Sequence, residues 1–326
     1  MPHTHHDQET PGGLLTRSQR NLLHSVLLIG GMAALLAACA WIVAGPSAVL
    51  WTLVFAALGL MMTPTISSEL VLHLFGAKPL PAGDLPEVHR LVRALVARAG
   101  LQQTPALYYI ASPTMNAFTL GKRDDATIAM TSGLLRRLSL RELAGVLAHE
   151  ISHIRHNDMW VMGLADMISR MTRVMSFLGV WLLILNIPLM LTGAGQISWL
   201  LLILLVFAPT IGTLLQLALS RVREYDADAD AAHLTGDPAG LAAALETLEQ
   251  QQGRFWEDIV LPGRRAPEPS VLRSHPHTSE RIKRLMAMRP RRPLIPADAL
   301  AAPWPRHSVI PDSPHRPRWR KWGMWY

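Results

Sequence analysis

Charged residues are scarce in this chain of 326 residues, at 17% of the sequence, where a typical soluble domain has about 25%. The deficit is local, because residues 21–68 and 174–220 contain no Asp, Glu, Lys or Arg. Uncharged runs of this length exclude a wholly soluble enzyme and a disordered chain. The single cysteine, Cys39, excludes an intramolecular disulfide framework. No internal repeat of about 20–50 residues is visible.

Each uncharged run is long enough for two membrane-spanning helices, since one crossing takes roughly 20 apolar residues. Turn residues near the middle of each run, Gly45-Pro46-Ser47 and Thr192-Gly193-Ala194-Gly195, support this division. We therefore expect four transmembrane helices, at about 22–44, 48–67, 174–191 and 197–219. The segment Leu36-Ala37-Ala38-Cys39 resembles a lipoprotein cleavage site, but the apolar residues that follow Cys39 favour an uncleaved anchor.

The charged segments predict one soluble domain that is divided between two stretches of the chain. The first stretch, residues 69–173, has a helical pattern from Asp84 to Ala99, two strand candidates at Ala106–Ile110 and Ala126–Met130, and a capping box in which Ser139 is followed by Glu142. The second stretch is residues 221–288, between an uncharged hairpin and a basic tail at 289–326 rich in Pro and Trp; residues 1–20 form an N-terminal tail. The expected fold class is mainly α, with four transmembrane helices and a small α+β domain.

The net charge of +7 could indicate nucleic acid, but much of it lies in the C-terminal tail. Basic residues beside membrane spans more often mark the cytoplasmic side and the anionic lipid surface. We therefore expect the partners to be a lipid bilayer and protein substrates, and not nucleic acid. The sequence does not predict an oligomeric state.

The strongest chemical signal is His149-Glu150-Ile151-Ser152-His153. Residues four apart share one face of a helix, so His149 and His153 can bind one metal ion. Zinc with three protein ligands keeps a position for water and lowers the pKa of that water to about 7. Glu150 can then act as general base and later pass the proton to the leaving amine. A solvated polar face is the alternative, but it does not explain three polar residues in an apolar helix.

A third zinc ligand is expected on a second helix, which begins where the second uncharged run ends. Glu224 and Asp228 are four residues apart there, which suggests Glu224 as the ligand and Asp228 as the group that orients His149. On spacing alone, Asp226, Asp230 and Glu246 remain rival acids. Two membrane crossings between the motif and Glu224 return the chain to the side it left. An even number of spans is thus required if the ligands are to meet.

Together these motifs resemble the HtpX-type membrane zinc metalloproteases, which are related to the CAAX prenyl proteases and share the gluzincin plan. The resemblance covers roughly residues 15–288. The matching residues are the His149–His153 motif, Asp158, Glu224 and Asp228 within Ser-Arg-Val-Arg-Glu-Tyr-Asp-Ala-Asp, Asn116-Ala117-Phe118, and Ser274-His275-Pro276 with Arg281.

The resemblance implies a role for each matching residue. One zinc ion per chain would be held by His149, His153 and Glu224, with Glu150 as general base and acid. Asn116 and Ala117 would belong to an edge strand that binds the extended substrate. His275 would stabilise the oxyanion with Arg281 in support, while Asp158 would tie the motif helix to its surroundings. His277 stands where the family pattern leads us to expect proline, so His275 and His277 both remain candidates to face the site.

The predicted function is an integral-membrane zinc endopeptidase, and the resemblance implies misfolded or damaged membrane proteins as substrates. Basic residues flanking the spans predict a catalytic domain that faces the cytoplasm, and the resemblance implies the bacterial inner membrane as the location. The alternative is a non-catalytic scaffold or zinc-binding pseudoprotease that captures client proteins. A transporter is disfavoured, because His24 is the only ionisable side chain of Asp, Glu, Lys, Arg or His type within the expected spans.

Overall fold

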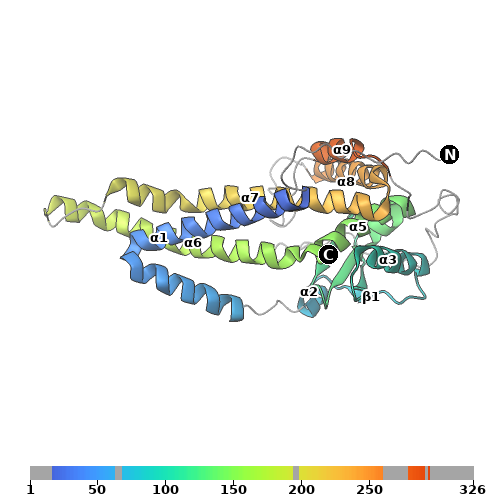
Figure 1. The fold of residues 1–326 in the computed structure, drawn as a ribbon, viewed down its shortest axis with the longest axis horizontal. Coiled ribbons are helices and arrows are strands. Elements are labelled where there is room, and N and C mark those ends of the chain that lie inside the picture. The colour runs from blue at the N-terminus through green and yellow to red at the C-terminus, as the bar shows by residue number, and fades with distance from the viewer. Residues whose placement is uncertain (1–16, 63–67, 194–197, 260–277, 291–292, 294–326) are drawn as a thin grey trace, which may run out of the picture.

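The computed structural model describes residues 17–62, 68–193, 198–259, 278–290 and 293. Three long helices extend from one end of a smaller mixed domain (Figure 1). They are α1 (Arg17–Met62), α6 (Asp158–Leu191) and α7 (Trp199–Thr235). The stretches Leu22–Ala56, Asp158–Leu191 and Trp199–Thr235 are long and apolar enough to cross a membrane, and each contains an 18-residue window with a mean hydropathy of 2.5, 2.2 and 2.3 respectively.

The expectation of four membrane helices is only partly supported, because the described residues give three such helices. The first predicted hairpin is one element, α1, with a bend at Ala44 and Gly45. Gly45 has φ of 68°, a left-handed conformation that glycine adopts without steric cost, and Pro46 follows it. The chain changes direction at this bend, so the two segments of α1 diverge (Figure 1). The predicted turn is therefore present, whereas a separate fourth spanning helix is not shown.

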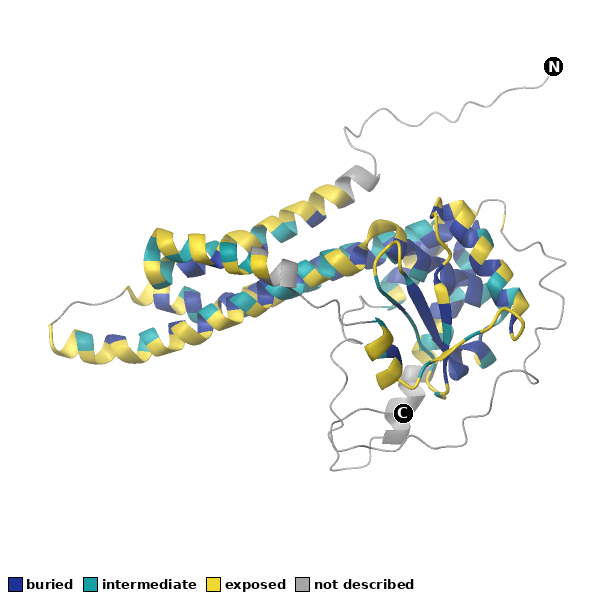
Figure 2. Ribbon diagram, turned by 90° about the horizontal axis from the view of Figure 1, so that it is seen from below, coloured by how far each residue is buried: buried dark blue, intermediate teal, exposed yellow. Residues whose placement is uncertain are grey.

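The second predicted hairpin consists of α6 and α7, which pack along each other and against α1 (Figure 1). Both helices extend well beyond the uncharged run, α6 starting at Asp158 and α7 ending only at Thr235. Gly179 lies in the contact between them, where an added Cβ would come within 2.5 Å of the Leu205 side chain. Away from these contacts the helices expose large apolar side chains such as Phe177 and Leu200, as expected for a lipid-facing surface (Figure 2).

The mixed domain contains a four-stranded sheet in the order β1-β2-β4-β3. The strands are β1 (Lys78–Pro79), β2 (Ala106–Ile110), β3 (Ala117–Leu120) and β4 (Thr127–Thr131). β2 and β4 are parallel with Leu107 opposite Ile128, and β3 is antiparallel to β4 with Phe118 opposite Ala129. β2 and β4 confirm the two strand predictions, β4 with a shift of one residue. Because β3 is the last strand in this order, it lies at one edge of the sheet.

Six shorter helices complete the described part of the domain. They are α2 (Ser68–Leu74), α3 (Pro86–Ala99), α4 (Ser132–Arg137), α5 (Leu140–His156), α8 (Pro238–Ile259) and α9 (Thr278–Met286). The main core joins α3, α5 and α8 to the sheet through fully buried side chains such as Leu95, Ile128 and Leu147. α5 is thus held inside the domain, which fixes the position of the side chains that it carries.

Candidate metal centre and active site

α5 carries the histidine motif and has well-defined ends. Ser139 and Glu142 form the predicted capping box: the Ser139 side chain accepts from the Glu142 N–H, and Glu142 Oε2 accepts from the Ser139 N–H at 2.8 Å. The helix ends at Asn157, whose φ of 55° is the left-handed conformation that asparagine tolerates better than most residues. α6 begins at the next residue, Asp158, so a single residue separates the motif helix from a membrane helix.

Three side chains converge at the inner face of α5. His149 Nε2 lies 3.1 Å from His153 Nε2 and 3.4 Å from Glu224 Oε2, and His153 Nε2 lies 3.8 Å from Glu224 Oε1. One candidate ligand atom from each of the three residues lies within 4.8 Å of the others. Zinc–ligand bonds of 2.0–2.1 Å in a tetrahedron place neighbouring ligand atoms about 3.3 Å apart. The donor types and their spacing therefore fit a zinc ion.

The rival acids of α7 and α8 lie outside this group. Asp230 Oδ1 accepts a hydrogen bond from Arg155 at 2.8 Å, and Asp226 lies 3.9 Å from an Arg223 nitrogen. Glu246 is exposed on α8. Among the candidates on these helices, only Glu224 shares the convergence point with both histidines. The return of α7 along α6 brings it there, as the even-span argument requires (Figure 1).

Each histidine has an aspartate behind its second ring nitrogen. His153 Nδ1 is hydrogen-bonded to Asp158 Oδ2 at 2.7 Å, and His149 Nδ1 lies 3.1 Å from Asp228 Oδ1 as an ion-pair contact. Contacts of this kind orient an imidazole so that its Nε2 faces the metal position. Both aspartates are buried. The structure thus places Asp228 behind His149, where the spacing predicted it, and Asp158 behind His153.

Arg281 of α9 meets the acidic residues of the site. Its Nε and one terminal nitrogen donate to the two Asp228 oxygens, both at 2.7 Å, and its other terminal nitrogen lies 3.2 Å from Glu224 Oε2. This fork is the bidentate geometry typical of arginine and carboxylate. Burial acts to lower the pKa of Arg281, but the Asp228 and Glu224 carboxylates raise it above its ordinary value. Its substrate-binding role stays a prediction.

The electrostatic field of the site favours positive charge. Burial acts to lower the pKa of His149, but hydrogen bonding and charge from Asp228 and Glu224 raise it to about 10. The same carboxylates would stabilise a divalent cation between the imidazoles, because they are close and shielded from water. The field and the donor set therefore point to the same kind of occupant.

The Glu150 carboxylate accepts a hydrogen bond from β3, the edge strand of the sheet. Thr119 of β3 donates its hydroxyl to Glu150 Oε2 at 2.8 Å, and the Thr119 side chain is buried. The sequence motifs did not single out Thr119. Alternation along a strand could have found it, because Thr119 shares a face of β3 with Ala117, two residues earlier.

The remaining predicted residues are only partly placed. Asn116 directly precedes β3; its N–H donates to Thr131 Oγ1 at 2.9 Å and its carbonyl accepts from the Thr131 N–H at 3.0 Å. Ala117 is the first residue of β3, opposite Met130. These contacts fix the start of the edge strand. His275 and His277 lie outside the described residues.

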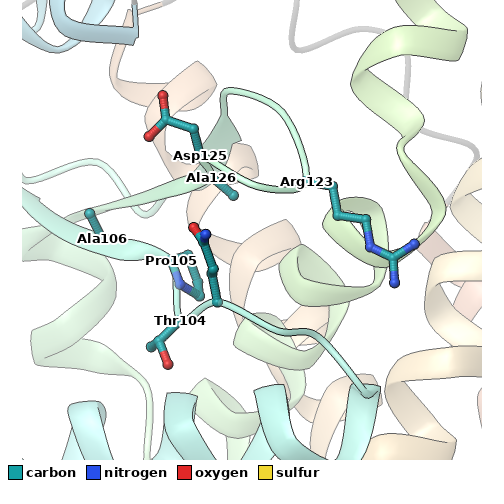
Figure 3. A pocket seen from close by; sticks show the side chains of 7 residues that line it. Thr104, Pro105, Ala106, Arg123, Asp125 and Ala126 are labelled. Carbon is teal, nitrogen blue, oxygen red and sulfur yellow. The ribbon is translucent and has the colours of Figure 1, made fainter.

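A small cavity of about 110 Å³ lies elsewhere in the domain, between the start of β2 and the turn that joins β3 to β4 (Figure 3). Thr104, Pro105 and Ala106 line one side, and Arg123, Asp125 and Ala126 line the other. None of the predicted site residues lines it. The cavity is therefore separate from the group formed by His149, His153 and Glu224.

Two histidines and a glutamate converge beside the Glu150 carboxylate, and the helix that carries the histidines leads into an apolar hairpin. This is the arrangement of a membrane metalloprotease. The comparisons agree. Residues 84–289 match the family model described as Peptidase family M48. This match covers more than half of the chain, and the chain belongs to peptidase family M48.

Several curated proteins are similar along most of their length. The chain is 33% identical over 297 residues to a protease HtpX homolog of Methylibium petroleiphilum, which covers 83% of this chain and 99% of that protein. It is 36% identical over 290 residues to a protease HtpX homolog of Acidiphilium cryptum, covering 82% and 96%. It is also 32% identical over 281 residues to protease HtpX of Legionella pneumophila, covering 82% and 99%. The resemblance seen in the motifs is thus confirmed.

A solved structure, that of Ste24p from S. mikatae, is similar with a TM-score of 0.43 and 20% sequence identity. The match covers 82% of this chain and 65% of that one, so this chain spans less than two thirds of its length. A likeness of this size carries no argument about function.

Proposed function

We propose that this protein is an integral-membrane zinc endopeptidase that hydrolyses peptide bonds of misfolded or damaged membrane proteins. The observation that carries the proposal is the convergence of His149, His153 and Glu224 within 4.8 Å, next to Glu150. Membership of a peptidase family supports proteolysis as the reaction. The proposed gluzincin plan is supported by the donor set, in which a glutamate from a second helix joins the two histidines.

His149, His153 and Glu224 would hold one zinc ion per chain. Zinc, when bound, acidifies a water molecule and polarises the scissile carbonyl. Glu150 receives the proton of the attacking water on its carboxylate and delivers it to the leaving amine. Thr119 donates to Glu150 Oε2, and Oε1 is the oxygen proposed to take the proton. Asp158 and Asp228 keep the two imidazoles in orientation.

The substrate is proposed to bind along β3. This strand pairs with β4 on one side and has no strand on its other side within the described part of the sheet. An extended peptide can pair with such an edge through main-chain hydrogen bonds. Asn116 and Ala117 would then contact the substrate backbone beside the bond that is cut. Arg281 and His275 complete the proposed set, His275 as the group that stabilises the oxyanion.

In the membrane, the two segments of α1 are proposed to form a hairpin, which gives four crossings together with α6 and α7. The bend at Gly45 supports this arrangement. The catalytic domain would face the cytoplasm from the bacterial inner membrane, because the basic residues flank the spans on that side. A reporter fused after Tyr326 should therefore read as cytoplasmic, and an external signal would contradict the orientation.

The mechanism is tested by comparing wild type with Glu150→Gln. Both proteins are purified in detergent, loaded with zinc and given an unfolded, fluorescently labelled substrate. General acid–base catalysis is worth roughly 10²- to 10⁴-fold, so the variant should cleave at least about 100-fold more slowly with the same zinc content. A zinc-loaded variant that cleaves as fast as wild type would rule the mechanism out. A wild type that binds zinc and substrate without cleavage would favour the scaffold.

A further inference from the structure

Arg223 is a buried charge that the proposed mechanism does not use. It lies on α7, one residue before Glu224, with 10% of its side chain exposed. One of its terminal nitrogens donates to Asp158 Oδ1, and the other lies 3.9 Å from Asp226 Oδ2. Burial of a charged group is costly unless the charge is paired and hydrogen-bonded. The burial of this guanidinium therefore suggests that its hydrogen bond to Asp158 has a function.

The carboxylate that Arg223 binds is also the one that holds a candidate zinc ligand. Asp158 presents Oδ1 to Arg223 and Oδ2 to His153 Nδ1, the latter at 2.7 Å. With one oxygen held on each side, the carboxylate cannot rotate about its Cβ–Cγ bond without losing a charged hydrogen bond. The orientation of the His153 ring, and with it the direction of Nε2, depends on that carboxylate.

We propose that Arg223 is a positioning residue for His153, acting through Asp158, and that it thereby sets the zinc affinity of the site. This inference rests on the proposed zinc-dependent function. α7 would then have two roles within two adjacent residues: Glu224 binds the metal directly, and Arg223 fixes the second histidine. Because Asp158 is the first residue of α6, the same contact joins the two arms of the apolar hairpin beside the site.

The other half of the site has a matching chain of contacts. Arg281 binds Asp228, which lies behind His149. Arg281 also lies 3.2 Å from Glu224, so its removal would disturb two candidate ligands at once. Arg223 contacts Asp158 and Asp226, and of these two carboxylates it is Asp158 that holds a candidate ligand, His153. Arg223 is therefore the arginine for which an indirect effect can be isolated.

The experiment is a double-mutant cycle on the full chain in detergent. The variants are Arg223→Gln, Asp158→Asn and the two combined, with Arg221→Gln as the matched control because Arg221 is exposed on the same helix. The zinc Kd is measured by competition with a chelator, and the visible spectrum of the Co²⁺-substituted protein reports the ligand geometry. Arg223→Gln should weaken zinc binding about tenfold and change the Co²⁺ spectrum.

The combined variant should bind zinc no more weakly than Asp158→Asn alone, because residues that act through one contact are not additive. Arg221→Gln should keep the wild-type Kd. Additive losses in the cycle, or an unchanged Kd and Co²⁺ spectrum in Arg223→Gln, would overturn the proposal and leave Arg223 as a helix-packing contact.

A second variant covers the case in which Arg223→Gln does not fold. Arg223→Lys keeps the charge but lacks the planar fork, so its zinc Kd should lie between those of wild type and Asp158→Asn. A wild-type Kd in Arg223→Lys would then overturn the proposal. If wild type itself does not bind zinc at one ion per chain, the proposed function fails. If wild type binds zinc and the Arg223 variants match it, only the inference about Arg223 fails.

Discussion

Replacing Gly145 with alanine adds one methyl group to α5 where this helix crosses α8. The new Cβ would lie 2.7 Å from Leu241 Cα and 2.8 Å from Leu241 N, both backbone atoms that cannot rotate away. Alanine gains about 1 kcal/mol over glycine in a helix interior, whereas overpacking a core costs about 1–3 kcal/mol. Because the close contacts are with backbone, we expect the cost to win and the variant to lose about 1–2 kcal/mol of stability.

Gly163 of α6 provides the matched control. It is exposed, and an added Cβ there would meet no atom within 4 Å. Gly163→Ala should therefore keep only the helix-propensity gain and become more stable by about 0.5–1 kcal/mol. The same chemical change is thus expected to have opposite signs at two helical positions of one chain.

The assay is unfolding of the detergent-purified full chain, followed by circular dichroism, with zinc content measured on each sample. Gly145→Ala should unfold at a lower temperature than wild type, and Gly163→Ala at a higher one. If Gly145→Ala is as stable as wild type, the close approach of α5 and α8 does not limit the packing. If both variants are destabilised alike, the steric explanation is refuted, because only one position has a neighbour in contact.

Three further predictions concern the site and its supports. Thr119→Val removes the hydrogen bond to the Glu150 carboxylate, and a hydrogen bond to a charged group is worth about 1.5–3 kcal/mol. The kcat should therefore fall about 10- to 100-fold, and Thr119→Ser should recover it. A wild-type kcat in the valine variant would contradict this prediction. Glu224→Ala should lower zinc occupancy far more than Asp226→Ala, and equal losses would remove the ligand assignment. Arg141 holds the pKa of Asp237 below its ordinary value of 3.8, so their pairing stabilises the fold above that pH and is lost as the pH falls through the lower, folded pKa. The gap in unfolding temperature between wild type and Asp237→Asn should therefore be present at pH 7 and close under strong acid; a gap that persists there would contradict the pairing.

The elements that carry local signals could be predicted from the sequence. The capping box, the apolar stripe and the two histidines four apart all lie within α5, so a short segment contains the whole pattern. The helix boundaries next to the membrane were less well predicted. The charge pattern predicts breaks where charge begins, near residues 173 and 220, but α6 and α7 run through both points. A helix ends where caps, glycine or proline end it, and a change of polarity does none of these.

The contacts between distant segments could not be predicted from spacing. Asp226, Asp230 and Glu224 lie on one helix, and which of them faces the histidines depends on how α7 is rotated against α5. Arg281 binds Asp228 and Glu224 from α9, and that approach depends on the path of the chain after α8. Thr119 belongs to no motif, and alternation along β3 from Ala117 was the one signal that could have found it.

The place of the hairpin in the chain also determines when the site can form during synthesis. His149 and His153 emerge from the ribosome before α6, but Glu224 follows only after α6, the turn and much of α7. The three donor side chains can therefore come together only when both arms of the hairpin, α6 and α7, lie side by side. If that pairing takes place in the bilayer, a newly made chain that has not yet been inserted carries an incomplete centre. Assembly of the metal centre would then follow membrane integration, because the third donor reaches the histidines only through the paired hairpin.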